Sequence, residues 1–296
     1  MALSVIKNRT DAILFLSGIL KSVNLHFING ITVTCKNFAD FMLNVAIEVH
    51  KQTLLRHGIL IQIKPNFIKF KTRKGEVKLF YSSSDKEQIK DNLGAFVEQF
   101  VCSQYDWLNT KDHIVVDIGA YIGDSAIYFA LNGAKHVYAL EPYPYAYGLS
   151  VKNIKINNLE GKVTIINEGI GSKNTFITVN KSYKSRRDDD IKLFKEGKKI
   201  RITTLDELVK RFNIKDAVLK IDCEGAEYDV ILNTSTLTLR KFKQMIIEYH
   251  YGYENLERKL SAAGFTCRHT TPIYSFNSRQ NQHAYIGLLF AERSKL

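Results

Sequence analysis

Two acidic side chains, Asp117 and Glu141, each follow a short apolar run and have the spacing of a nucleoside-binding site. Asp117 begins the pattern Asp-x-Gly-x-x-x-Gly with Gly119 and Gly123, and Glu141 comes about 20 residues after this glycine turn. In a Rossmann-type crevice, a glycine-rich first turn and a later acid hold an adenosine ribose. Pro142 then ends the second apolar run, because proline cannot continue a strand's hydrogen-bond ladder. The spacing predicts a ligand that contains adenosine.

The glycine pattern favours S-adenosylmethionine (SAM) over a dinucleotide. Dinucleotide sites have Gly-x-Gly-x-x-Gly, which lets the backbone approach a pyrophosphate at a helix N-terminus. SAM has no phosphate but carries an ammonium group, which a carboxylate at Asp117 suits. An ordinary strand-to-helix turn would explain the glycines alone, but it would not explain the acid that follows. The other residues predicted to contact the cofactor belong to this turn and to the end of the next strand: Gly119, Ala120, Tyr121, Gly123, Glu141 and Pro142.

A second group of titratable side chains ends two later apolar runs. Side-chain direction repeats every two residues in a strand, so Glu248 and His250 are expected on one face. Asp222 and Glu224 pair in the same way if the chain is still extended there. Ligands of open α/β sheets bind at the carboxyl ends of strands, where these four side chains would meet. Glu224 and Glu227 have a simpler alternative role as local caps or ion-pair partners, Glu227 at a helix start.

The elements that must position these residues alternate between strand and helix from residue 112 onward, which predicts a parallel sheet with crossovers. Seven strands are predicted, at Ile114–Asp117, His136–Glu141, Val163–Asn167, Ala217–Asp222, Lys243–Tyr249, Gly264–Arg268 and Ala284–Phe290. Helices are predicted at Ser125–Leu131, Tyr145–Asn157, Leu205–Phe212, Ala226–Leu232 and Glu254–Ala263. The fold class is therefore α/β with a Rossmann-like sheet, and its seven strands resemble the sheet of class I methyltransferases, which implies that the last strand is antiparallel.

Residues 1–108 have no Rossmann signature and are predicted to form a small α+β accessory or acceptor-binding region before a catalytic domain at residues 109–296. Apolar spacing predicts a helix over Phe38–Leu55, and alternation predicts strands within Ile59–Tyr81, with a hairpin turn at Lys74-Gly75. The polar segment 180–199 is expected to be a surface loop, or alternatively a lid over the acceptor pocket.

Composition sets broad limits on the class of protein. The chain has 296 residues, 45% hydrophobic and 24% charged, which is an ordinary globular balance. Its four cysteines are far apart, which argues against a zinc site or disulfide framework and fits a reducing cytoplasm. A net charge of +12 favours polyanionic partners such as nucleic acid, phospholipid headgroups or a phosphate-bearing acceptor.

The apolar stretch Ala12–Leu20 is too short to span a bilayer and is followed by no signal-cleavage pattern. We expect a helix that is buried in the N-terminal region. Basic residues on both sides leave peripheral contact with the inner membrane face as an alternative.

Several motifs together resemble the FkbM family of SAM-dependent O-methyltransferases. They are Val115-Val-Asp-Ile-Gly-Ala-Tyr-Ile-Gly, Tyr138-Ala-Leu-Glu-Pro, Thr204-Leu-Asp-Glu-Leu, Leu219-Lys-Ile-Asp-Cys-Glu-Gly-Ala-Glu and Ile247-Glu-Tyr-His. The resemblance covers roughly residues 110–290. It implies a SAM-dependent O-methyltransferase that acts on a hydroxyl of a sugar, glycolipid or polyketide-type natural product. It also implies that Glu168 and Gly169 lie at the end of the third strand, near the adenine.

Methyl transfer to a neutral hydroxyl requires removal of its proton. His250 is the expected base, with Glu248 orienting it or sharing the proton, while Asp222 and Glu224 hold acceptor hydroxyls or the cofactor ammonium. In a less favoured alternative, Asp222, Glu248 and His250 bind magnesium or manganese, which oxygen-rich ligand sets suit.

Two other classes of function stay open. The positive charge favours an RNA methyltransferase, but the chain has Asp-Cys-Glu-Gly where base-amine methyltransferases place Asn-Pro-Pro-aromatic. A non-catalytic SAM-binding module is the second alternative. The expected acceptor is a hydroxyl, or alternatively a carboxylate, of a sugar in a lipid- or phosphate-linked glycan at the cytoplasmic membrane face.

Overall fold

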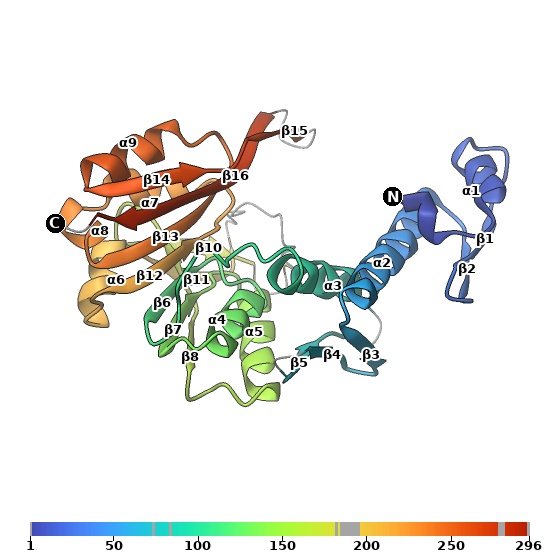
Figure 1. Ribbon diagram of the computed structural model, residues 1–296, viewed down its shortest axis with the longest axis horizontal. Coiled ribbons are helices and arrows are strands. Elements are labelled where there is room, and N and C mark those ends of the chain that lie inside the picture. Colours follow the sequence, from blue (N-terminus) through green and yellow to red (C-terminus); the bar gives the residue numbers. More distant parts are fainter. Residues whose placement is uncertain are drawn as a thin grey trace. The chain divides into compact units, whose positions relative to one another are not determined.

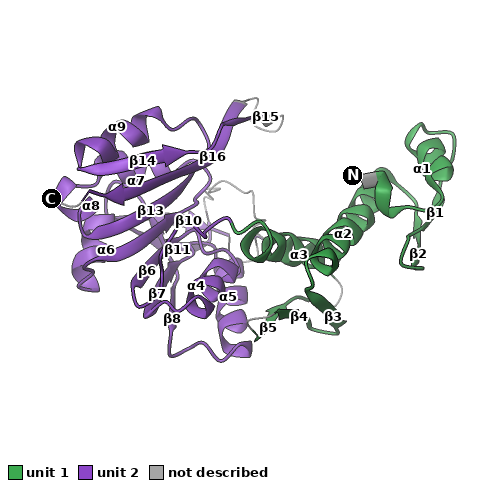
Figure 2. Cartoon of the chain, in the orientation of Figure 1, with its two compact units in different colours: residues 1–103 green, residues 104–296 purple. Residues whose placement is uncertain are grey.

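The computed structural model describes residues 2–72, 75–82, 85–180, 183, 196–277 and 282–294. The chain forms two compact units, residues 1–103 and 104–296 (Figure 2). This division lies a few residues before the boundary expected from the sequence, and the role expected for the N-terminal region stays a prediction.

Unit 1 contains the predicted long helix and the predicted strands. Helix α2 (Phe38–Arg56) begins after Asn37, whose side chain accepts a hydrogen bond from the backbone N–H of Asp40 and so caps the helix. Strands β3 (Leu60–Lys64), β4 (Phe67–Thr72) and β5 (Gly75–Phe80) form an antiparallel sheet. Lys74, in the predicted hairpin turn, lies outside the described residues. Helix α3 (Lys86–Phe100) ends the unit.

The apolar N-terminal stretch is only half-buried. It follows a 3-10 turn, η1 (Ala2–Val5), and forms helix α1 (Arg9–Leu16), which packs near the hairpin of β1 (Val23–His26) and β2 (Thr32–Cys35). Ala12 and Phe15 are buried, whereas Ile13 and Leu16 are 53% and 43% exposed. The expectation of a buried helix was therefore wrong for the outer face of α1. Among the described residues, no helix is long and apolar enough to cross a membrane.

Seven strands of unit 2 form one mixed sheet in the order β14, β16, β13, β12, β6, β7, β8 (Figure 1). Strand β16 runs antiparallel to both of its neighbours, and the five strands from β13 to β8 run parallel to one another. The bounds are β6 (Ile114–Ile118), β7 (His136–Leu140), β8 (Val163–Ile166), β12 (Ala217–Ile221), β13 (Phe242–Tyr249), β14 (Phe265–His269) and β16 (Gln282–Arg293), and β15 (Ile273–Asn277) pairs with β16. The predicted Rossmann-like methyltransferase sheet is confirmed.

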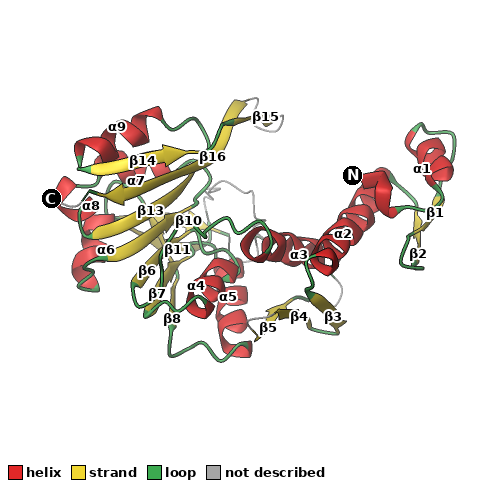
Figure 3. Cartoon of the chain, viewed as in Figure 1, coloured by secondary structure: helices red, strands yellow, loops and turns green. Residues whose placement is uncertain are grey.

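Helices alternate with these strands through most of unit 2 (Figure 3). The five predicted helices are present as α4 (Asp124–Leu131), α5 (Pro144–Ile156), α6 (Leu205–Arg211), α7 (Glu227–Asn233) and α9 (Glu254–Ala262), and the short α8 (Thr236–Leu239) was not predicted. Apolar residues of α6, α7, α8 and α9 form one buried core with the central strands. The central strands are mostly apolar because a parallel sheet is covered on both faces.

A second, small sheet positions the end of β8. Its strands are β9 (Glu168–Ile170), β10 (Thr175–Val179) and β11 (Lys198–Thr203), with β11 antiparallel to β10 and parallel to β9. This sheet was not predicted. Within the segment expected to be a loop or lid, residues 181–182 and 184–195 lie outside the described residues.

Candidate active site

The turn after β6 lies directly against the ends of two neighbouring strands. Gly119 has φ +77°, and a Cβ atom added there would lie 1.7 Å from the backbone oxygen of Asp222, which follows β12. The N–H groups of Gly119 and Ala120 both donate to the Leu140 oxygen of β7, at 3.1 and 2.9 Å. The N–H of Tyr121 donates to the Glu141 carboxylate at 3.0 Å. Since these three N–H groups are already used, they cannot cradle a pyrophosphate, which agrees with a cofactor that has none.

Gly123 serves the packing of the helix that follows the turn. It has φ +81° and immediately precedes α4. A Cβ atom there would lie 3.2 Å from the Cβ atom of Ser150 in α5. The predicted turn glycine is therefore required for the approach of α4 to α5, and its contact with the cofactor stays a prediction.

Glu141 is buried at the end of β7 and is held by the backbone. Its carboxylate accepts hydrogen bonds from the N–H groups of Tyr121 and Tyr143, at 3.0 and 2.8 Å. Burial raises the pKa of the Glu141 carboxyl to about 8, and those two N–H donors oppose the rise. The Asn167 side chain donates to the backbone oxygens of Glu141 and Pro142, which fixes the end of β7 against the end of β8.

A pocket opens beside these residues at the carboxyl ends of β6 and β7. Mostly apolar residues line it, with Glu168 as the acidic exception: Ile118, Gly119, Leu140, Pro142, Glu168, Gly169, Ile170, Cys223 and Ala226. Apolar walls suit an adenine ring, and Glu141 at the neighbouring strand end suits a ribose diol. The residues present therefore fit the adenosine part of SAM.

Glu168 and Gly169 lie at this pocket, as the family resemblance implied. Both carboxylate oxygens of Glu168 accept hydrogen bonds from the Arg211 guanidinium, at 2.9 and 2.8 Å. A Cβ atom on Gly169 would lie 2.6 Å from Ile202 Cδ1, so the glycine permits close packing there. The Glu168 carboxylate is engaged by arginine, and a contact with adenine stays a prediction.

Asp117 is fully buried and forms an ion pair with a lysine that the sequence analysis missed. Its Oδ2 accepts from the Ser125 hydroxyl at 2.6 Å, and its Oδ1 lies 3.2 Å from Lys220 Nζ. Lys220 also donates to the Gly119 oxygen at 2.8 Å and lies 3.8 Å from Asp222 Oδ2. Burial alone would lower the pKa of Lys220, but the charges of Asp117 and Asp222 raise it well above the usual lysine value.

This arrangement corrects the role expected for Asp117. The side chain has no exposed surface, which argues against the predicted direct contact with the methionyl ammonium. Its buried charge is matched by Lys220, as a buried carboxylate requires. The sequence signal that could have revealed this ion pair is a lysine within the otherwise apolar strand β12, all five residues of which are buried.

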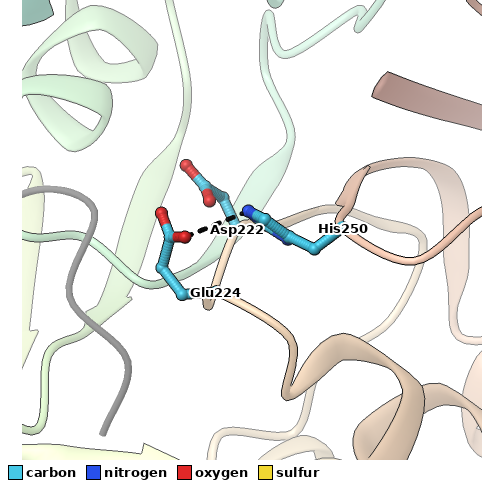
Figure 4. Close-up of side chains that lie close together, drawn as sticks. All are labelled: Asp222, Glu224 and His250. Atoms are coloured by element: carbon cyan, nitrogen blue, oxygen red, sulfur yellow. Dashed lines mark ion pairs between the residues drawn. The ribbon is translucent and has the colours of Figure 1, made fainter. Parts of the chain in front are cut away.

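Asp222, Glu224 and His250 meet at the carboxyl ends of β12 and β13 (Figure 4). One ligand atom from each lies within 4.8 Å of the others, and His250 Nε2 is 3.1 Å from Glu224 Oε2. The predicted meeting of these side chains is found, but for a different reason. Glu224 has φ +53°, so the chain has left the extended conformation, and a turn rather than strand alternation brings Glu224 to Asp222.

Glu227, expected as a local cap or ion-pair partner at a helix start, is also a member of this cluster. It is the first residue of α7, and its side chain is fully buried. Its Oε1 lies 3.0 Å from His250 Nδ1 and accepts from the His250 N–H at 3.1 Å, while its Oε2 accepts from the Gly225 N–H. Glu227 therefore sets the orientation of the imidazole.

Glu248 does not have the role expected for it. It accepts a hydrogen bond from the Gln104 side chain at 3.0 Å, whereas the carboxylates paired with His250 are Glu224 and Glu227. The reason is that β13 ends at Tyr249, so the strand alternation that would align Glu248 with His250 does not continue. The alternative metal ligand set that included Glu248 is not assembled either.

The charge of His250 also corrects an expectation. Burial alone would lower its pKa, but the hydrogen bonds to Glu224 and Glu227 outweigh burial and raise the pKa to about 11. The imidazole is therefore protonated at neutral pH between two carboxylates. A protonated imidazole has no lone pair with which to accept a proton, so the neighbouring carboxylate of Glu224, not His250, can act as the base in this state.

The glycine turn, Glu141, the pocket and the His250 cluster all lie within the residues that one family model matches. The model described as the methyltransferase FkbM domain matches residues 117–267, about half of the chain. The chain belongs to the FkbM methyltransferase family. Residues 117–267 are a methyltransferase domain, and the glycine turn and pocket within it fit SAM as the cofactor.

Short stretches of this FkbM protein are also similar to other methyltransferases. It is 47% identical over 53 residues to the ribosomal protein L11 methyltransferase of Carboxydothermus hydrogenoformans, covering 18% of this chain and 17% of that protein. It is 36% identical over 81 residues to protein arginine N-methyltransferase 1 of Oryza sativa subsp. indica, covering 27% and 20%. The chain thus spans a fifth or less of the length of these relatives.

Among solved structures, the FkbM protein is similar to M. capricolum TrmK in complex with S-adenosyl-homocysteine. The identity is 16% and the TM-score 0.43, over 66% of this chain and 69% of that one. A putative rRNA methylase from Clostridium thermocellum is 12% identical, with a TM-score of 0.42, over 66% and 97% of the two chains.

Replacing Glu141 with alanine is expected to weaken SAM binding by roughly one to two orders of magnitude, because the buried carboxyl group that would hydrogen-bond the ribose diol is lost. Calorimetric titration of the full chain with SAM measures the effect. Glu160→Ala, at an exposed turn residue outside the pocket, is the matched control and should bind as wild type does. A Glu141→Ala protein that melts normally and keeps wild-type affinity would contradict the assignment.

Proposed function

We propose that this FkbM protein is an O-methyltransferase that acts on a hydroxyl of a sugar, glycolipid or related natural product. The observation that carries the proposal is the cluster of Asp222, Glu224 and His250 beside the glycine turn. The backbone of Asp222 lies against Gly119, so acceptor chemistry at the cluster would occur next to the cofactor pocket. A hydroxyl needs a group that takes its proton, and the cluster supplies one.

Each residue of the cluster has a distinct part in the proposed reaction. SAM, when bound, supplies a methyl group on a sulfonium, which is already a good leaving group. Glu224 accepts the proton of the acceptor hydroxyl, and the His250 imidazolium holds the Glu224 carboxylate in place at 3.1 Å. Glu227 fixes the ring of His250, and Asp222 accepts a hydrogen bond from the acceptor and so orients it.

The proposed acceptor class rests on the family and on charge. A net charge of +12 suits an acceptor that carries phosphate, such as a phosphate-linked glycan. The same charge favours RNA as the alternative acceptor. The acceptors named for the L11 and arginine methyltransferases are not carried over, because the chain spans so little of those proteins.

Methyl transfer from isotopically labelled SAM tests this proposal. The full chain is incubated with extracted lipid-linked glycan and, separately, with bulk RNA from the same cells. We expect label in the glycan that resists mild alkali, since an ether is stable where a methyl ester, formed on a carboxylate, would be released. Label in RNA alone, with binding that falls steeply as salt rises, would overturn the sugar acceptor. SAM binding without transfer to either acceptor would favour a non-catalytic module.

A further inference from the structure

Two carboxylates and one imidazole converge at the carboxyl ends of β12 and β13 (Figure 4). Their ligand atoms lie within 4.8 Å of one another. Ligand atoms around a small divalent cation, each about 2.1 Å from it, lie roughly 3–4 Å apart, so a modest contraction would close the cluster on an ion. The three side chains follow two adjacent strands, and those of Asp222 and Glu224 are 23% and 26% exposed, which leaves part of the site open to other ligands.

The imidazole of His250 is oriented in the way that metal-binding histidines commonly are. Its Nδ1 is 3.0 Å from the fully buried Glu227, and its backbone N–H donates to the same carboxylate oxygen at 3.1 Å. Metal-binding histidines commonly give one ring nitrogen to a carboxylate, which fixes the ring and points the other nitrogen at the ion. Here the other nitrogen, Nε2, faces Glu224.

From this geometry we infer that Asp222, Glu224 and His250 bind a divalent cation of the manganese or magnesium class, with Glu227 as the positioning residue for the imidazole. The cation takes the place of the proton on His250 Nε2, which is released to solvent. Two carboxylate ligands with one imidazole, and no thiolate among them, suit these hard cations. Glu248, whose carboxylate accepts from Gln104, is not a ligand. The positions of the ion that face away from the protein would take water or acceptor oxygens. That last role rests on the proposed function, whereas binding of the ion does not.

Titration with Mn²⁺ tests this inference. Free Mn²⁺ is followed by electron paramagnetic resonance as it is added to the full chain after chelator treatment, and we expect one ion bound per chain. Asp222→Asn, Glu224→Gln and His250→Gln should each weaken binding by at least roughly tenfold, and Glu227→Gln by about 10–100-fold. Glu248→Gln is the matched control and should bind Mn²⁺ as wild type does. Added Mg²⁺ should compete.

Two results would overturn the inference. One is wild-type protein that binds no stoichiometric Mn²⁺, and the other is a Glu248→Gln variant that loses binding while folded Glu224→Gln keeps it. Thermal melts and SAM calorimetry on each variant separate loss of the ion from loss of the fold. If no ion binds but Glu224→Gln still loses methyl transfer, the proposed function stands without the cation.

Discussion

Glutamine in place of Glu224 should lower the turnover number for methyl transfer by roughly 10²–10⁴-fold, the usual contribution of a positioned proton acceptor. SAM affinity should stay near wild type, because Glu224 belongs to the cluster with Asp222 and His250 and does not line the pocket beside Glu141. The measurement is single-turnover transfer from labelled SAM at saturating acceptor, with calorimetry for the cofactor. A fall in turnover with unchanged cofactor affinity is the signature of a group that acts in the transition state.

Two further variants test the assignment of the base to Glu224. His250→Ala should also lower turnover strongly and leave SAM affinity unchanged, because the imidazole holds Glu224 and is itself held by Glu227. Glu248→Gln should have a much smaller effect, since Glu248 contacts Gln104 rather than the cluster. If Glu248→Gln loses turnover while Glu224→Gln keeps it, the assignment of the base to Glu224 is wrong.

Replacing Gly119 with alanine is expected to lower the free energy of unfolding of unit 2 by more than about 4 kcal/mol, a loss typical of severe steric clashes. The added Cβ would lie 1.7 Å from a backbone oxygen, and backbone cannot move aside as a side-chain end can. The residue would also be held at φ +77°, which disfavours any side chain. Thermal and denaturant unfolding of the full chain, with SAM calorimetry, measure the loss.

Gly148→Ala provides the control for this prediction. Gly148 lies within α5, and a Cβ atom there would meet nothing within 4 Å. Alanine should therefore stabilise the helix by roughly 0.5–1 kcal/mol. A Gly119→Ala protein as stable as Gly148→Ala would show that the two strand ends are farther apart than described.

The main sheet could be predicted because its strands are buried on both faces. Each of β6, β7 and β12 is mostly apolar and ends in a polar or glycine-rich turn, and no exposed residue interrupts it, since Asp117 in β6 and Lys220 in β12 are buried. The sheet of β9, β10 and β11 gave no such signal. Its shortest strand has three residues, one of them the glutamate that binds Arg211, and only pairing with a distant strand makes it extended.

The sequence predicted which residues form the candidate site better than it predicted which of them contact one another. Asp222, Glu224 and His250 could be found because they follow two apolar runs. The partner of His250 could not, because the rule of alternating side chains holds only inside a strand. Beyond Tyr249 and Ile221 the backbone turns, so the imidazole meets Glu227 instead of Glu248. Local geometry at strand ends depends on tertiary packing that spacing does not encode.

The buried Lys220 forms ion pairs with both parts of the site, the glycine turn with Asp117 and the cluster with Asp222. Lys220 lies between Asp117, under the cofactor turn, and Asp222, in the acceptor cluster. Removing Asp117 or Lys220 alone would leave the charge of its partner stranded away from water, at a cost beyond the loss of its own contact, whereas Asp222 is 23% exposed and its removal leaves the Asp117–Lys220 pair intact. Single substitutions at Asp117 or Lys220 will thus mix charge imbalance with function, and only compensated pairs can separate the two. For the same reason, Asp117 and Lys220 should change together or not at all as related sequences diverge.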